Sequence, residues 1–166
     1  PVLNSIEQLI LWNKFISNNS FVTNDNQVAI HLDTGMNRLG LQPQDIEIIS
    51  NDITLIQNIN IQLIMSHFAC AENINNKKNI EQLNLFDKLK KKLPTAPASI
   101  ANSAATLANK RNHYDLIRTG IALYGFNPIN DEDKILSETI LLQSRIIQIK
   151  SITKPSSVGY GATYKV

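Results

Sequence analysis

Five short stretches combine ionisable or hydroxyl side chains with glycine or alanine, residues that let a backbone approach a ligand closely. Their arginines could bind carboxylates. A serine and free amides could bind a phosphate, and a histidine and a tyrosine could transfer protons. The stretches are HLDTGMNRLG (31–40), MSHFACAE (65–72), ANSAAT (101–106), RTGIALYG (118–125) and VGYGATY (158–164).

Each stretch also has an ordinary structural interpretation. Asp33 could cap a loop, and Gly35 could mark a turn. A lone histidine such as His67 is more often semi-buried with its hydrogen bonds satisfied than catalytic. Arg118 could form a surface ion pair, and Tyr160 could simply pack. What favours a site is position, because four of the five stretches follow predicted strands, where parallel sheets and barrels bind ligands.

The predicted elements alternate between strands and helices. An amphipathic pattern places the apolar residues of the last helix on one side, namely Ile80, Leu83, Leu85, Phe86 and Leu89. Such alternation with short loops indicates βα units and a parallel sheet, with the motif loops gathered at the C-terminal ends of the strands. Strands are predicted over 27–33, 61–67, 98–101 and 115–118, and helices over 5–16, 42–50 and 76–93.

The character of the chain changes after Gly125. Residues 127–134 are polar and are typical of a linker. Residues 138–154 form a long β-rich run with no helix after it, which predicts strands of a second, β-type domain.

Composition limits the classes of partner. The net charge is +2, and the one dense lysine run, KLKKK (88–92), ends a helical pattern without interleaved aromatics, so we predict no nucleic-acid partner. Cys70 is the single cysteine, which excludes an internal disulfide and favours the cytoplasm. No apolar run reaches membrane-spanning length and no signal peptide opens the chain, although it begins at Pro1 and not at Met. We predict no membrane partner and no metal site.

In order and spacing, the five stretches resemble the alanine racemase family, enzymes that use pyridoxal 5'-phosphate (PLP) to interconvert L- and D-alanine. The pair DTGMNRLG and VGYGATY separates this family from PLP barrels with decarboxylase or aldolase activity. The resemblance implies an α/β fold: a partial (β/α)8 TIM-type barrel with parallel strands over 1–126, a linker over 127–137, and the first strands of a C-terminal β domain over 138–166.

The resemblance also implies which residues bind PLP. Ser103, with Asn102 beside it, and the backbone N–H groups of Gly120 and Ile121 are expected to contact the phosphate. Arg118 is expected to face the pyridine nitrogen. Because a guanidinium keeps its proton near neutral pH, that nitrogen stays unprotonated and the cofactor is a weaker electron sink.

Further roles follow from the resemblance. Tyr160 is expected to transfer a proton on one face of the substrate, helped by His67 lying between Tyr160 and Arg118. Arg38 and the backbone of Met36 are expected to bind the substrate carboxylate. The family forms homodimers with shared active sites, so Tyr160 should lie far from Arg118 within one chain. The implied role is a cytoplasmic enzyme that supplies D-alanine for peptidoglycan.

Two features depart from the family pattern. The family's PLP-binding lysine lies in a KANAYGHG-like motif, which this chain lacks, so we expect a fragment that is inactive alone. His31 stands where the family usually has a lysine, often carbamylated, that supports the arginine at position 38. Two alternatives remain open: a racemase of another amino acid such as serine or lysine, and a non-catalytic remnant of a racemase gene.

Overall fold

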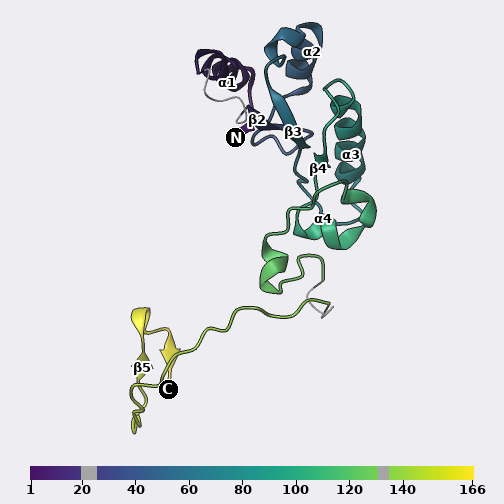
Figure 1. The fold of residues 1–166 in the computed structure, drawn as a ribbon. Helices are drawn as coiled ribbons and strands as arrows, with labels where there is room; N and C mark the ends of the chain where they lie inside the picture. The colour runs from purple at the N-terminus through teal and green to yellow at the C-terminus, as the bar shows by residue number, and fades with distance from the viewer. Residues whose placement is uncertain (20–25, 131–134) are drawn as a thin grey trace.

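Four short parallel strands form the central sheet of the computed structural model, which describes residues 1–19, 26–130 and 135–166 (Figure 1). The strand order is β1-β2-β3-β4. Each strand pairs in parallel with the next, as in Val2 with Ala29 and Ile64 with Ala98. The strands are β1 (Val2–Leu3), β2 (Gln27–His31), β3 (Asn60–Met65) and β4 (Ala98–Ser99).

A helix follows each strand of this sheet, which is the βα repeat that the sequence predicts. Ser5 and Asn76 begin their helices as side-chain caps, since each accepts a hydrogen bond from the first turn. Pro43 occupies the first helical position, where its missing N–H costs nothing. The helices are α1 (Ile6–Asn18), α2 (Pro43–Asn51), α3 (Lys77–Lys90) and α4 (Ser103–Ala108), and 3-10 turns follow at η1 (Ile53–Leu55), η2 (Lys110–Asn112) and η3 (Ile121–Tyr124). The fold is a partial α/β barrel.

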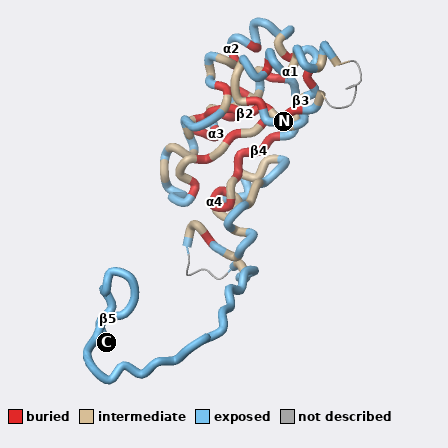
Figure 2. The backbone as a smooth tube through the Cα atoms, turned by 90° about the vertical axis from the view of Figure 1, so that its left-hand side faces the viewer, coloured by how far each residue is buried: buried red, intermediate tan, exposed pale blue. Residues whose placement is uncertain are grey.

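The core lies between the sheet and its helices, where Figure 2 shows the buried residues. On α3, Leu83, Phe86 and Leu89 face this core, as the amphipathic pattern predicts. The prediction was wrong for Ile80, which is 64% exposed. Ile80 lies in the first turn of α3. The largest fully buried apolar side chains are Phe86, Leu9, Ile30, Leu32, Leu41, Ile46, Ile49, Ile64, Leu89 and Ile100.

Residues 115–118 do not form the predicted strand, although they run beside β4. The N–H groups of Asp115 and Leu116 both donate to the Ala98 carbonyl, at 3.1 and 3.2 Å, so the bonds do not alternate along a ladder. The Asp115 carboxylate also accepts the Ala98 N–H at 2.8 Å. A side chain thereby takes the donor that a paired strand would use.

Residues 138–154 likewise contain no strand, which corrects the second β prediction. Leu142 is 95% and Ile147 98% exposed, and Figure 1 shows this segment running away from the sheet. A strand is stable only beside partner strands, and the described residues place none next to this segment. Beyond it, β5 (Ser157–Val158) pairs antiparallel with β6 (Tyr164–Lys165) around η4 (Tyr160–Ala162). Among the described helices, none has the length and apolar character needed to span a membrane.

Candidate functional site

One open cleft of about 300 Å³ lies at the C-terminal ends of the sheet strands. Six residues that the sequence predicted as site residues line it together, as expected for motif loops that gather at one rim. The lining consists of His67, Glu72, Asn102, Ser103, Ala104, Arg118, Gly120, Ile121 and Pro128.

Backbone amides converge on the hydroxyl of Ser103. Gly120 N–H donates to Ser103 Oγ at 2.9 Å, and Ala122 N–H donates to the same oxygen at 3.2 Å. Ser103 is the first residue of α4, and Asn102 caps that helix by accepting the Ala105 N–H at 3.0 Å. Converging N–H donors and a hydroxyl at a helix start are the groups that bind a phosphate. The sequence analysis did not predict a role for the Ala122 amide. Its position in the first turn after Gly120 is the signal that could have indicated this role.

Arg118 lines this cleft and is half-buried. Its Nη1 donates to Ser99 Oγ, and its Nη2 donates to the Ser66 carbonyl at 2.5 Å. Its own N–H donates to the Ala101 carbonyl at 3.0 Å. Burial lowers the pKa of Arg118, but from so high a value that the guanidinium stays charged near neutral pH.

His67 shares the cleft with Arg118 and is also half-buried. Burial lowers the pKa of His67, and the nearby charges of Arg118, Arg38 and His31 lower it further, in that order. His67 is therefore neutral near pH 7. The Arg118 guanidinium donates to Ser99 and Ser66, and its influence on His67 is electrostatic.

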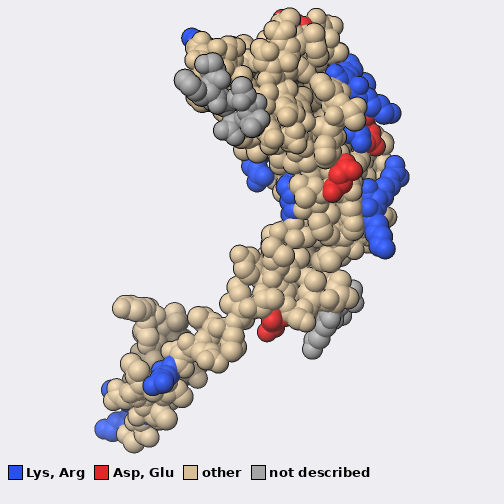
Figure 3. Space-filling view, viewed as in Figure 1, with Lys and Arg blue, Asp and Glu red and all other residues tan. Residues whose placement is uncertain are grey.

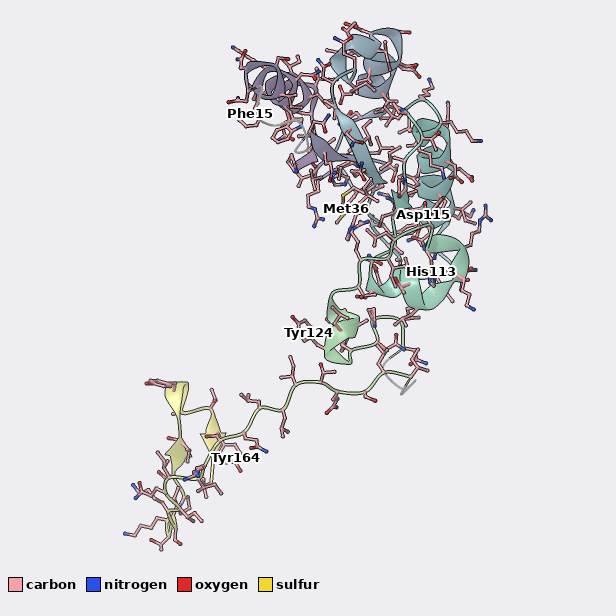
Figure 4. All side chains as sticks on the ribbon, viewed as in Figure 1. Phe15, Met36, His113, Asp115, Tyr124 and Tyr164 are labelled. Carbon is pink, nitrogen blue, oxygen red and sulfur yellow. The ribbon has the colours of Figure 1, made fainter. Side chains whose placement is uncertain are left out.

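The loop after β2 is held by Asp33, as the sequence predicts. The buried Asp33 carboxylate accepts N–H groups from Gly35 and Asn37, both at 3.0 Å. Gly40, with φ of 113°, closes the loop where an added Cβ would lie 2.7 Å from the Asp33 nitrogen, so only glycine fits. Met36 (Figure 4) and the exposed Arg38 project from this loop and are not among the lining residues of the cleft.

His31 is anchored to Asn4. Its Nδ1 lies 2.8 Å from Asn4 Oδ1, and Asn4 Nδ2 donates to the Val2 carbonyl at 3.1 Å. Because Asn4 Oδ1 is thus the acceptor, His31 carries its proton on Nδ1. Burial lowers the pKa of His31, and Arg118 and Arg38 act in the same direction while Asp33 opposes them.

Tyr160 lies away from the cleft within this chain. It is fully exposed in η4, on the C-terminal segment that Figure 1 shows apart from the sheet. Tyr164, labelled in Figure 4, marks the same segment. This placement agrees with the prediction that Tyr160 and Arg118 are far apart in one chain.

Basic side chains gather on the edge of the molecule that carries α3 and η2 (Figure 3). Some of them are paired: Lys90 lies 3.2 Å from Asp87, and Lys92 contacts Glu47. This is the solvated lysine face that the sequence predicts. Across residues 1–19, 26–130 and 135–166, no cluster of three or more His, Cys, Asp or Glu side chains could hold a metal ion.

Comparison with known proteins identifies relatives along nearly the whole chain. The chain is 37% identical over 164 residues to the alanine racemase of Rickettsia akari, which covers 99% of this chain and 44% of that protein. It is 39% identical over 136 residues to a catabolic alanine racemase of Mesorhizobium japonicum, covering 82% of this chain and 36% of the relative. The chain thus spans less than half the length of these relatives.

Solved structures show the same fold. The biosynthetic alanine racemase from Pseudomonas aeruginosa matches with a TM-score of 0.80 and 31% identity over 99% of this chain and 45% of that chain. The alanine racemase from Bartonella henselae, with covalently bound pyridoxal phosphate, matches with a TM-score of 0.73 and 30% identity over 83% of this chain and 40% of that chain. Residues 1–128 match the family model described as "Alanine racemase, N-terminal domain". The chain therefore belongs to the alanine racemase family.

Proposed function

We propose that the protein catalyses the PLP-dependent interconversion of L-alanine and D-alanine by a two-base mechanism, and that this chain supplies part of the cofactor cleft. The observation that carries the proposal is the single cleft in which Ser103 and its converging amides lie together with Arg118 and His67. Family membership supports the same activity. No feature of the described residues favours serine or lysine over alanine as substrate.

The donors in the cleft fit PLP. The Ser103 hydroxyl and the amides of Gly120 and Ala122 are suited to its phosphate, with the Ile121 amide between them and Asn102 fixing Ser103 through the cap of α4. When bound, PLP supplies an electron-withdrawing ring that makes the substrate Cα proton removable.

Arg118 serves the pyridine side of the cofactor in this proposal. Its guanidinium is held by Ser99 and Ser66 and keeps its charge, so it donates a hydrogen bond and leaves the ring nitrogen unprotonated. A cofactor with an unprotonated ring nitrogen withdraws fewer electrons, so negative charge at Cα would be short-lived. A short-lived charge favours return of a proton to Cα over side reactions.

Proton transfer on one face of Cα falls to Tyr160. A tyrosine with an ordinary pKa near 10 needs nearby positive charge or hydrogen-bond donors to act as a base near neutral pH. His67, beside the permanent charge of Arg118, is placed to give that help. Because Tyr160 lies away from the cleft of its own chain, Tyr160 of the partner subunit completes the site in a homodimer.

The substrate carboxylate is bound by Arg38 and the Met36 backbone. The loop that carries them is fixed by Asp33, and the charge of Arg38 reaches both His67 and His31. Arg38 is exposed, which leaves its guanidinium accessible to an incoming anion.

The proposal also covers the division of the chain into domains and the cellular role of the protein. We divide the chain into barrel residues 1–126, a linker over 127–137 and the start of a β domain over 138–166. The match to the barrel family over residues 1–128 supports the first boundary. The protein acts in the cytoplasm and supplies D-alanine for peptidoglycan, and the isolated chain is inactive because the PLP-binding lysine motif is missing from it.

The test compares this chain alone with the longer protein, in which the same chain is joined to the sequences encoded upstream of Pro1 and downstream of Val166. D-Alanine formed from L-alanine and PLP is measured with a D-amino-acid oxidase assay. We expect racemisation only in the longer protein. Faster racemisation of serine or lysine would favour another substrate, and no racemisation of any amino acid would favour a non-catalytic remnant.

A further inference from the structure

A buried glutamine of α3 reaches the loop that carries His67. Gln82 is 1% exposed, so its amide must find its partners inside the protein. Its Oε1 accepts the Ala69 N–H at 2.9 Å, and its Nε2 donates to the His67 carbonyl at 2.9 Å. One side chain thus bonds the backbone on both sides of Phe68.

The second Nε2 proton ties Gln82 to the barrel strands. Nε2 donates to Thr34 Oγ1 at 3.3 Å, and that hydroxyl lies 2.7 Å from Ser66 Oγ. Ser66 Oγ donates its single proton to the Leu32 carbonyl at 2.7 Å, so Thr34 donates to Ser66. Donor and acceptor are thus fixed for each hydrogen bond in this network. Exchanging the positions of the Gln82 amide oxygen and nitrogen would break the three bonds as they stand.

The same network reaches Arg118. The Ser66 carbonyl accepts Nη2 of Arg118 at 2.5 Å, and the Ser66 N–H donates to the Ser99 carbonyl at 2.9 Å. The Ser66 backbone carbonyl therefore binds the Arg118 guanidinium, and the Ser66 hydroxyl binds Thr34. Gln82 and Arg118 lie at the two ends of one buried polar path.

We propose that Gln82 is a positioning residue of the cleft, which fixes the His67 loop relative to Arg118 through the His67 carbonyl and the Ala69 N–H. Its catalytic meaning rests on the proposed function, but the loop position can be measured without any turnover.

The hydrogen-bonding chemistry of the side chain explains why residue 82 is a glutamine. Methionine would fill a similar volume but leave the His67 carbonyl and the Ala69 N–H without partners. An ionised glutamate would keep an acceptor for Ala69 but lose the donor for the His67 carbonyl, whereas a protonated glutamate would donate through its O–H. Asparagine is one methylene too short to reach both backbone groups from α3.

The experiment compares Gln82→Met with Leu83→Ala. Leu83, 8% exposed and next in sequence, contributes to the core without bonding the loop, so Leu83→Ala tests simple destabilisation. Two readouts are used: hydrogen exchange of the Ala69 amide, and NMR titration of the His67 ring with the His113 signals as reference. The charged or titratable groups around His67 are Arg118, Arg38, His31 and Glu72.

For Gln82→Met we expect exchange of the Ala69 amide to accelerate about tenfold or more. We also expect the pKa of His67 to rise toward the ordinary value of about 6.5, because the ring leaves its buried place beside Arg118. Leu83→Ala should lower Tm and leave both local readouts unchanged. Gln82→Glu, a second variant of nearly native volume, should keep the Ala69 amide protected in either protonation state, because a carboxyl oxygen still accepts its N–H.

Equal behaviour of Gln82→Met and Leu83→Ala in both readouts would show that Gln82 only packs, and the proposal would be wrong. The same conclusion follows if the Ala69 amide exchanges as fast in Gln82→Glu as in Gln82→Met. If both local readouts change as expected while the longer protein racemises nothing, the proposed function fails and the positioning role of Gln82 stands.

Discussion

The Tyr114 hydroxyl donates to Asp87 Oδ1 at 2.9 Å and so ties the segment leading to Arg118 to helix α3. Tyr114 has a φ of 48°, a left-handed conformation that is uncommon for a bulky residue. Its ring packs edge-on against Phe86 with centroids 5.3 Å apart, and Lys90 Nζ lies 4.6 Å from its centroid. These contacts hold a strained turn four residues before Arg118.

Tyr114→Phe should therefore lower the free energy of unfolding by about 1 kcal/mol, the usual contribution of one hydrogen bond. Asp87 keeps its ion pair with Lys90, which limits the loss. Urea unfolding at pH 7 measures the change, and Tyr124→Phe is the matched control because Tyr124 is 59% exposed. Equal stabilities of the two variants would contradict the anchoring role of Tyr114.

The sequence predicts those elements whose cause lies within a few neighbouring residues, and it does not predict those that depend on contacts with distant residues. The parallel strands β2, β3 and β4 and the helices α1, α2 and α3 follow from periodicity within a few residues. Strand β1 was not predicted, because two residues are too few to show a period. The strand predicted over 115–118 was wrong because Asp115 bonds Ala98, 17 residues away in the sequence. Strands over 138–154 depend on partners that local pattern cannot reveal.

The candidate site divides in the same way. The gathering of the motif loops follows from their position, because loops after parallel strands share one rim, while the resemblance to the family named the individual residues. Gln82 was missed, since a glutamine amid lysines on an amphipathic helix indicates a solvated position. Its burial follows from the path of the His67 loop over α3, which is tertiary structure.

Acid should destabilise the protein through the buried His31 and the half-buried His67. Burial and the nearby arginines lower the pKa of His31 and of His67, so the folded state favours the neutral rings. Their contribution to stability is present above the unfolded pKa of about 6.5 and is lost as pH falls through the lowered folded values. We expect His31→Gln to flatten this acid limb in urea unfolding between about pH 7 and 5. If the stability of His31→Gln falls with pH as steeply as that of the native protein, His31 does not contribute to the acid sensitivity.

Ser103→Ala should weaken PLP binding about tenfold, since the hydroxyl and the geometry of the Gly120 and Ala122 amides are lost together. The measurement is an absorbance titration of the protein with PLP. Ser17→Ala is the control, because Ser17 Oγ bonds the Asn13 carbonyl on the exposed side of α1. Unchanged affinity in Ser103→Ala would place the phosphate elsewhere.

The chain alone should give no single PLP-modified lysine after borohydride reduction. No lysine is among the residues that line the cleft, in the part of the chain that the structure describes. Peptide mapping by mass spectrometry should find only scattered, low-level modification of surface lysines. One lysine modified in stoichiometric amount, together with alanine racemisation, would overturn the proposed inactivity of the isolated chain.

The last prediction concerns His31 and Arg38. The proton on Nδ1 of His31 is used by Asn4, and a neutral imidazole can offer Arg38 only one acceptor. A lysine is usual at this position in the family, and when carbamylated it would instead offer Arg38 a negative charge and charge-assisted hydrogen bonds.

His31→Lys in the longer protein, with bicarbonate added, should therefore hold Arg38 more firmly and lower KM for alanine several-fold, while kcat changes less. His31→Gln with the same bicarbonate is the matched control, because its amide cannot be carbamylated. If the lysine variant binds carboxylate substrates no more tightly, with or without bicarbonate or chloride, then His31 only packs against Asn4 at the end of β2 and the support of Arg38 lies elsewhere.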